Sequence, residues 1–169
     1  MNKHVYAAAL ILLSLSAIAD EHDCPMHEEH MRAKKSASTV DERGDHVMGF
    51  SHEKTKHTFR LLDDGGAIEV RADDAADTAS IAAIRTHLKE IAGEFSTGAF
   101  AKPEEIHARV PDGVEVMKKL ANAITYEYQE IERGGVVRLT TSDPAGIEAV
   151  HQFLRFQIKD HHTGDPTTP

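Results

Sequence analysis

The fold is decided by residues 57–71, which read His57-Thr58-Phe59-Arg60-Leu61-Leu62-Asp63-Asp64-Gly65-Gly66-Ala67-Ile68-Glu69-Val70-Arg71. Apolar and polar side chains alternate on both sides of the Asp-Asp-Gly-Gly turn, as they do in strands that bury one face. The two glycines tolerate the positive φ angles that tight hairpin turns need. The stretch therefore predicts an antiparallel hairpin with strands over 57–62 and 67–71.

An amphipathic helix is expected after this hairpin, over about residues 78–95. Its apolar residues recur every three or four positions and so share one helical face: Ile81, Ile84, Leu88, Ile91 and Phe95. Gly98 follows soon after the last of them, as glycine often does at a helix end. Hairpin and helix together make a ββα unit.

The same order of elements returns later in the chain. Residues 124–131 and 136–140 alternate as strands around Arg133-Gly134-Gly135, and a helix is expected from Asp143-Pro144. Matching the two glycine pairs also aligns the apolar stripes of the two helices. The match favours an internal duplication. Convergent patterning is the alternative, because any two hairpin-plus-helix units match loosely.

These patterns predict an α+β fold, a two-layer sandwich from a duplicated ββα unit, with antiparallel hairpins and helices on one face. The folded domain is expected over residues 46–162. Residues 20–45 are polar, lack apolar periodicity and are predicted to form a flexible leader, and residues 163–169 a disordered tail. Short helical pieces are expected between the two units, at 103–107 and 114–120.

Residues 1–19 have the parts of a secretory signal peptide. Lys3 precedes an apolar run over residues 5–15, and Ala17 and Ala19 form a small-x-small cleavage signal. The apolar run is too short to span a bilayer. We expect cleavage after Ala19 and a periplasmic or secreted protein that is not held at the membrane once the signal is removed.

Composition narrows the choice of function. The formal net charge of −9 argues against nucleic acid as a partner. The sequence contains no Gly-x-Ser-x-Gly, no Walker A and no Gly-x-Gly-x-x-Gly motif, which lowers the expectation of an enzyme. The unusual feature is the presence of 12 histidines beside a single cysteine.

The expected new N-terminus would itself be a metal site. In Asp20-Glu21-His22, the free α-amine of Asp20, two amide nitrogens and the His22 imidazole can surround one ion in a plane. Square-planar nitrogen coordination suits Cu(II) or Ni(II). The motif depends entirely on cleavage after Ala19.

A cluster of soft ligands follows in the leader. Thiol, thioether and imidazole groups stand close together there, at His22, Cys24, Met26, His27, His30 and Met31. Thiolate and thioether favour Cu(I), whereas imidazole serves copper, zinc and nickel alike. No packing role explains cysteine and methionine in so polar a segment. A solvated leader that binds metal only adventitiously is the alternative.

A second ligand-rich stretch begins the folded domain. His46, Met48, His52 and His57 could complete a copper site if this segment folds back on itself, although their spacing matches no fixed metal template. His57 also alternates in register with Phe59. It is therefore expected either as a ligand or as a half-buried strand residue.

The remaining histidines receive structural interpretations. His87 and His151 lie beside the apolar stripes of the two predicted helices. His161 continues the second stripe and is expected to be a cation at the helix C-terminus, stabilised by the helix dipole. His107 could meet Met117 across the Pro111-Asp112-Gly113 turn.

Two resemblances extend this interpretation. Cys24-Pro25-Met26-His27 resembles the Cys-Pro-Met-His signature of metal-efflux adaptor proteins and copper-pumping ATPases, which implies metal binding and a transport or efflux protein as a partner. From Gly44 to His161 the chain is similar to a family of small uncharacterised bacterial proteins. Some of its members carry the label aspartate carbamoyltransferase, but the Ser-Thr-Arg-Thr phosphate-binding motif of that activity is missing here.

The sequence thus predicts a periplasmic metal-binding protein, with copper as the expected ion and zinc or nickel as possible ones. Its role would be capture, delivery or tolerance of the metal. A metal-dependent hydrolase with its ligands in the folded domain is one alternative. A metal-free interaction module that uses the bare face of the sheet is the other.

Overall fold

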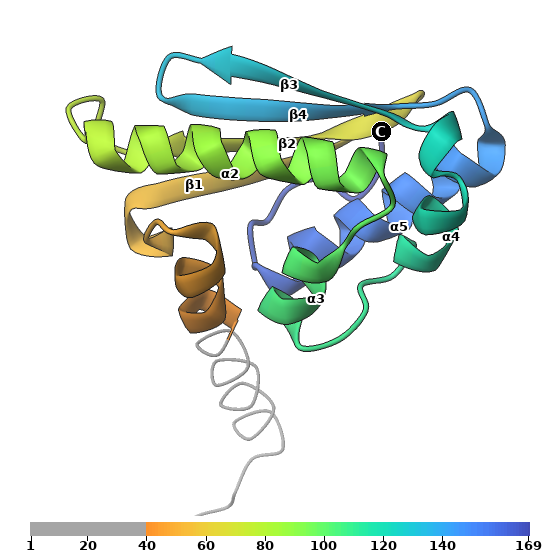
Figure 1. Cartoon of the computed structure of the whole chain (residues 1–169), viewed down its shortest axis with the longest axis horizontal. Coiled ribbons are helices and arrows are strands. Elements are labelled where there is room, and N and C mark those ends of the chain that lie inside the picture. The colour runs from red at the N-terminus through yellow and green to blue at the C-terminus, as the bar shows by residue number, and fades with distance from the viewer. Residues whose placement is uncertain (1–39) are drawn as a thin grey trace, which may run out of the picture.

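The computed structural model describes residues 40–169 and shows a sheet of four strands covered by helices on one face (Figure 1). The strands are β1 (Thr55–Leu62), β2 (Gly65–Ala72), β3 (Thr125–Ile131) and β4 (Gly134–Thr140). They lie in the order β1-β2-β4-β3, and all neighbours are antiparallel. The predicted α+β class and both predicted hairpins are confirmed.

Two long helices form the second layer, α2 (Thr78–Ser96) and α5 (Pro144–Asp160). Each begins at an aspartate that accepts backbone hydrogen bonds from the first turn: Asp77 from Ser80 N at 3.0 Å, and Asp143 from Ala145 N at 2.8 Å. Such caps satisfy amide groups that have no partner inside the helix. The local sequence therefore sets where both helices start.

Each long helix packs mainly against the hairpin of the other unit. Helix α2 follows β2 but lies against β3 and β4, whereas α5 follows β4 and lies against β1 and β2. In the middle of the sheet, Ile68 of β2 pairs with Val137 of β4. The two ββα units therefore share one core rather than forming two. Their origin by duplication stays a prediction.

Shorter elements connect the parts of this core. They are η1 (His52–Lys54), α3 (Ala101–His107), α4 (Val114–Lys119) and η2 (Ala121–Ala123). Helices α3 and α4 stand close to the helical pieces expected from the sequence. Helix α4 packs on α5, whereas the C-terminus of α3 meets the C-terminal end of α5 through His107 and Asp160. This junction places His107 beside the sheet edge formed by β1.

The folded domain includes residues before the boundary at 46 that the sequence suggested. Residues 40–48 form a helix that buries Val40 and Gly44, and Arg43 Nε donates to Ile106 O at 2.6 Å. Residues 40–45, expected in the flexible leader, thus belong to the domain. The nine described residues of this helix offer too few apolar repeats for periodicity to be detected.

The C-terminal tail is also fixed, although disorder was expected for residues 163–169. Asp165 Oδ2 accepts a hydrogen bond from Phe59 N at 2.9 Å, and Arg155 Nε donates to Thr167 O at 3.0 Å. Phe59 lies in β1, an edge strand whose outward amide groups have no neighbouring strand to bond. The tail supplies a partner for one of them.

Several predictions fall on residues outside the described part: the signal peptide, the start at Asp20, and the leader ligands at positions 22–31. Among residues 40–169, no helix has both the length and the apolar character needed to cross a bilayer.

Candidate functional site

The most unusual feature of the domain is a pocket lined by four histidines. His57 of β1, His87 of α2, His107 of α3 and His161 at the end of α5 all line it, together with Met48 and a largely apolar wall. We call it the inner pocket. Its volume is about 50 Å³, which is enough for an ion or a few water molecules.

Two of these histidines form a stack. The rings of His57 and His161 are nearly parallel, with an interplanar angle of 3° and a centroid distance of 5.6 Å. Phe50 and Phe59 extend the stack beside His57 and His161, with centroids 6.0 and 5.9 Å away. The stack fixes both imidazoles beside the pocket, and within residues 40–169 neither ring makes a hydrogen bond.

Both imidazoles are half-buried, and the loss of solvent around their rings favours the neutral form. Loss of solvent and, to a smaller extent, the nearby His52 together lower the pKa of His57 to about 4. Loss of solvent also lowers the pKa of His161 to about 3, with repulsion from His57 and His107 added. A neutral ring is the form that a metal ion binds. The same result corrects the expectation that His161 is a cation at the end of the helix.

His87 is the residue of the pocket that most clearly lacks a hydrogen-bond partner. The residue is only 8% exposed, and its Nδ1 atom is buried without a hydrogen-bond partner in the described part of the chain. Burial lowers the pKa of its ring to about 4. Phe50 meets it edge-on at 5.8 Å. A buried polar atom without a partner costs free energy, so such an atom in a pocket wall points to a bound species.

His107 has a different role, because both of its ring nitrogens are already engaged. Nδ1 lies 2.5 Å from Asp160 Oδ2, and Nε2 lies 3.0 Å from the side-chain amide of Gln157. Its ring also meets His161 edge-on, with a centroid distance of 5.0 Å. His107 therefore fixes the position of His161 and is not itself free to bind a ligand. Its contact with Met117 stays a prediction.

A second pocket adjoins the first. It has a volume of about 240 Å³ and shares Met48, His57 and His161 with the inner pocket. We call it the outer pocket. The helix over residues 40–48 forms one wall through Val40, Asp41 and Gly44. Because the pockets share three residues, the thioether and the two stacked imidazoles stand at the boundary between them.

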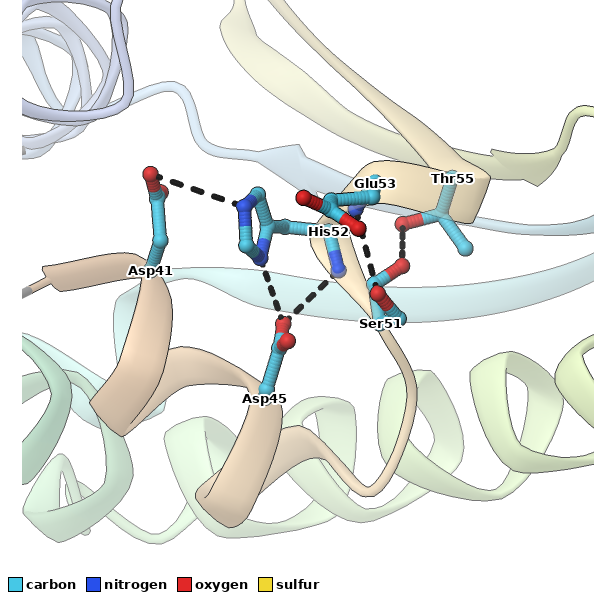
Figure 2. A network of polar contacts seen from close by, with 6 residues as sticks. All are labelled: Asp41, Asp45, Ser51, His52, Glu53 and Thr55. Atoms are coloured by element: carbon cyan, nitrogen blue, oxygen red, sulfur yellow. Dashed lines mark hydrogen bonds and ion pairs between the residues drawn. The ribbon is translucent and has the colours of Figure 1, made fainter. Parts of the chain in front are cut away.

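The outer pocket also contains a polar network centred on His52 (Figure 2). Asp45 Oδ1 accepts from the backbone N of His52 at 2.7 Å and lies 2.9 Å from its Nδ1. Asp41 Oδ2 lies 3.7 Å from Nε2, on the other side of the ring. Asp41 and Asp45 are one helical turn apart, so both carboxylates can face the same imidazole.

The network raises the pKa of His52. Partial burial acts to lower it, but the hydrogen bond that Asp45 accepts from the ring and the charges of Asp41 and Asp45 outweigh that effect. Of the five histidines whose pKa the fold shifts, His52 is thus the one shifted toward the charged form.

The structure divides the ligand set expected at His46, Met48, His52 and His57. Met48 and His57 line the same two pockets, but His52 is held by carboxylates and His46 is exposed on the helix over residues 40–48. Sequence proximity failed here because the helix turns His46 away from Met48. The segment does fold back, and it brings three of the four side chains, Met48, His52 and His57, to the lining of the outer pocket.

The sequence analysis assigned His87 and His161 to structural roles and gave His107 only a possible contact with Met117. These three residues come from α2, from the end of α5 and from α3, so no spacing motif could link them. The only sequence signal was the high histidine count itself. Tertiary structure brings them together because each long helix packs across the hairpin of the other unit.

Within residues 40–169, no three His, Cys, Asp or Glu side chains stand together in a way that could hold a metal ion. The parallel stack of His57 and His161 explains this finding in part. The two rings lie in parallel planes, so one ion cannot lie in the plane of both rings at once. An ion in the inner pocket would have to use Met48 or a rotated imidazole.

No family model matches the chain, and no match is found among the curated proteins or the solved structures. The function of the protein must therefore be inferred from the geometry of the two pockets.

Proposed function

We propose that the protein is an exported copper-binding protein whose folded domain takes up Cu(I) in the inner pocket. The observation that carries this proposal is the unpartnered Nδ1 of His87, buried in a wall that also holds Met48 and the imidazoles of His57 and His161. A coordinate bond to a metal ion would satisfy that nitrogen. Export rests on the signal peptide expected over residues 1–19.

The chemistry of the lining favours Cu(I) over zinc or nickel. Met48 is 7% exposed and is the one sulfur ligand that lines both pockets. A thioether is a soft ligand that selects Cu(I), whereas zinc is usually held by four ligands in a tetrahedron. One thioether with one or two imidazoles suits an ion that accepts low coordination numbers.

The leader would then supply the metal to this pocket. Its thiol, thioethers and imidazoles at positions 22–31 are suited to capturing copper, and at most about 30 Å of extended chain joins Met31 to Val40. The helix over residues 40–48 ends beside the outer pocket. Delivery to or from a transport or efflux protein is the role that we propose for the whole chain.

Competition with a colorimetric Cu(I) chelator under reducing conditions tests the proposal. The protein beginning at Asp20 is compared with two variants, one with all leader ligands replaced and one with Met48→Leu and His87→Leu. His46→Gln serves as the matched control, because His46 lies on the same helix as Met48 but is exposed. Thermal unfolding of each variant checks that the domain is intact.

We expect the leader variant to keep one tight Cu(I) site, and the pocket variant to lose at least about tenfold in affinity at that site. Loss of all tight binding in the leader variant would move the function to the leader and refute the domain site. If the unaltered protein cannot compete with the chelator for any ion, the metal-binding function itself is wrong.

A further inference from the structure

A separate pocket of opposite character lies on the outer surface of α5. Its volume is about 290 Å³, and its lining consists of Arg109, Asp112, Gln152, Arg155, Phe156 and Lys159. Three of these six residues are cations, in a chain whose formal net charge is −9. We call it the basic pocket. It shares no lining residue with the inner or the outer pocket.

The helix provides one wall of the basic pocket. Gln152, Arg155, Phe156 and Lys159 are spaced by three or four residues and therefore share one face of α5. Arg155 Nε donates to Thr167 O at 3.0 Å, and its Nη1 lies 3.5 Å from Glu148. Its Nη2 has no partner among the described residues. Lys159 likewise makes no hydrogen bond or ion pair within residues 40–169.

The other two lining residues, Arg109 and Asp112, come from the segment between α3 and α4. Ala108 ends α3 with φ of 52°, a left-handed conformation that costs a non-glycine residue free energy. The chain then places the guanidinium of Arg109 over the ring of Phe156, 4.4 Å from its centroid. Stacking of this kind holds the guanidinium plane while its N–H edge stays free to bind.

We infer that the basic pocket binds a small oxyanion ligand, a phosphorylated or carboxylated molecule that also carries a hydroxyl or ammonium group. Arginine forks match the paired oxygens of phosphate and carboxylate, and Lys159 adds a point charge. Asp112 is the only carboxylate in the lining. The negative charge of Asp112 disfavours a ligand that has only anionic oxygens, whereas its carboxylate can accept a hydrogen bond from a hydroxyl or ammonium group on the ligand.

The dimensions of the pocket favour a small molecule over a macromolecule. A volume of about 290 Å³ is near the lower limit of small-molecule sites. A nucleic acid would meet the acidic remainder of the surface. An acidic peptide is the competing class of ligand, and the experiment below distinguishes it.

Titration calorimetry with the protein beginning at Asp20 tests this inference, with inorganic phosphate, glycerol 3-phosphate and malate as probes. Arg109→Gln and Lys159→Gln remove cations of the pocket, and Lys119→Gln is the matched control on α4, outside the pocket lining. Asp112→Asn tests the donor requirement. A peptide of alternating Asp and Gly forms the competing arm.

We expect saturable binding of glycerol 3-phosphate or malate that is tighter than that of inorganic phosphate. Arg109→Gln and Lys159→Gln should weaken it at least about tenfold, Lys119→Gln should leave it unchanged, and Asp112→Asn should remove the preference over inorganic phosphate. The comparison of the first two probes separates a phosphate from a carboxylate ligand. Binding that is equally weak in all variants, or saturation by the acidic peptide alone, would overturn the inference.

Discussion

At His52, opposite effects act on a single imidazole, and the charged partners are the stronger. Partial burial favours the neutral ring, but Asp45 and Asp41 approach its two nitrogens from different sides and raise its pKa (Figure 2). The side chain stays 38% exposed, so solvent screens the ion pairs. The network therefore serves mainly to hold η1 against the helix over residues 40–48.

His52→Gln should lower stability at acid pH more than at alkaline pH. A pKa raised above its unfolded value of 6.5 adds stability that is fully present below that value and is lost as the pH rises through the folded pKa. We expect a loss of about 0.5 kcal/mol at pH 5.5, and a smaller loss at pH 8.5, from urea unfolding. His46→Gln is the control. Equal losses at both pH values would contradict the proposed ion pairs.

At the scale of elements, glycines set the distance between the helices and the sheet. Gly66 of β2 lies under α5, where an added Cβ would come 2.2 Å from Leu154 Cδ1 and 2.7 Å from Arg60 O. Gly135 of β4 holds the equivalent place under α2, with Leu88 Cδ1 at 3.0 Å. The glycines that the sequence offered as turn residues thus also provide the space that the helices need.

Gly66→Ala should destabilise the domain, because the backbone oxygen of Arg60 cannot move away from the new methyl group without disturbing the hairpin. We expect a loss of about 1–3 kcal/mol, as in other overpacked cores, measured by urea unfolding. Gly93→Ala is the matched control on α2, where an added Cβ meets nothing within 4 Å. That variant should gain about 0.5–1 kcal/mol through higher helix propensity. A neutral Gly66→Ala would show that α5 shifts outward at little cost.

Over the whole molecule, the buried histidines should make the domain sensitive to acid. The pKa values of His57 and His87 are lowered to about 4 and that of His161 to about 3, so the unfolded chain binds more protons below pH 6.5 than the folded one. Stability is then fully present above about pH 6.5 and falls as the pH drops toward 4. His52 acts in the opposite direction, but it is a single group against these three, and burial lowers the pKa of His107 as well.

His161→Gln should reduce this sensitivity. We expect the difference in unfolding free energy between pH 7.5 and pH 5 to shrink on the order of 1 kcal/mol, because one of the three suppressed protonation sites is removed. Urea unfolding at the two pH values measures it, with His162→Gln, an exposed neighbour, as the control. An unchanged difference would mean that His161 is charged or solvated in the folded protein.

The sequence by itself determined the elements of this protein. Alternation around Gly65-Gly66 and Gly134-Gly135 predicted both hairpins, and the three- and four-residue apolar spacing predicted α2 and α5, because these patterns act over a few residues of chain. It also identified histidine and methionine as the side chains to explain. It missed the ordered helix over residues 40–48 and the fixed tail, which depend on contacts with distant residues.

Only the tertiary structure decided which histidines meet. The four histidines of the inner pocket come from β1, α2, α3 and the end of α5: His57, His87, His107 and His161. They converge because each long helix packs on the hairpin of the other unit, over one shared core. The tertiary structure also turned His46 to the surface, away from Met48, and paired His52 with Asp41 and Asp45. Whether an imidazole binds a ligand, pairs with a carboxylate or faces solvent depends on burial and on partners far away in the sequence, and spacing along the chain contains neither.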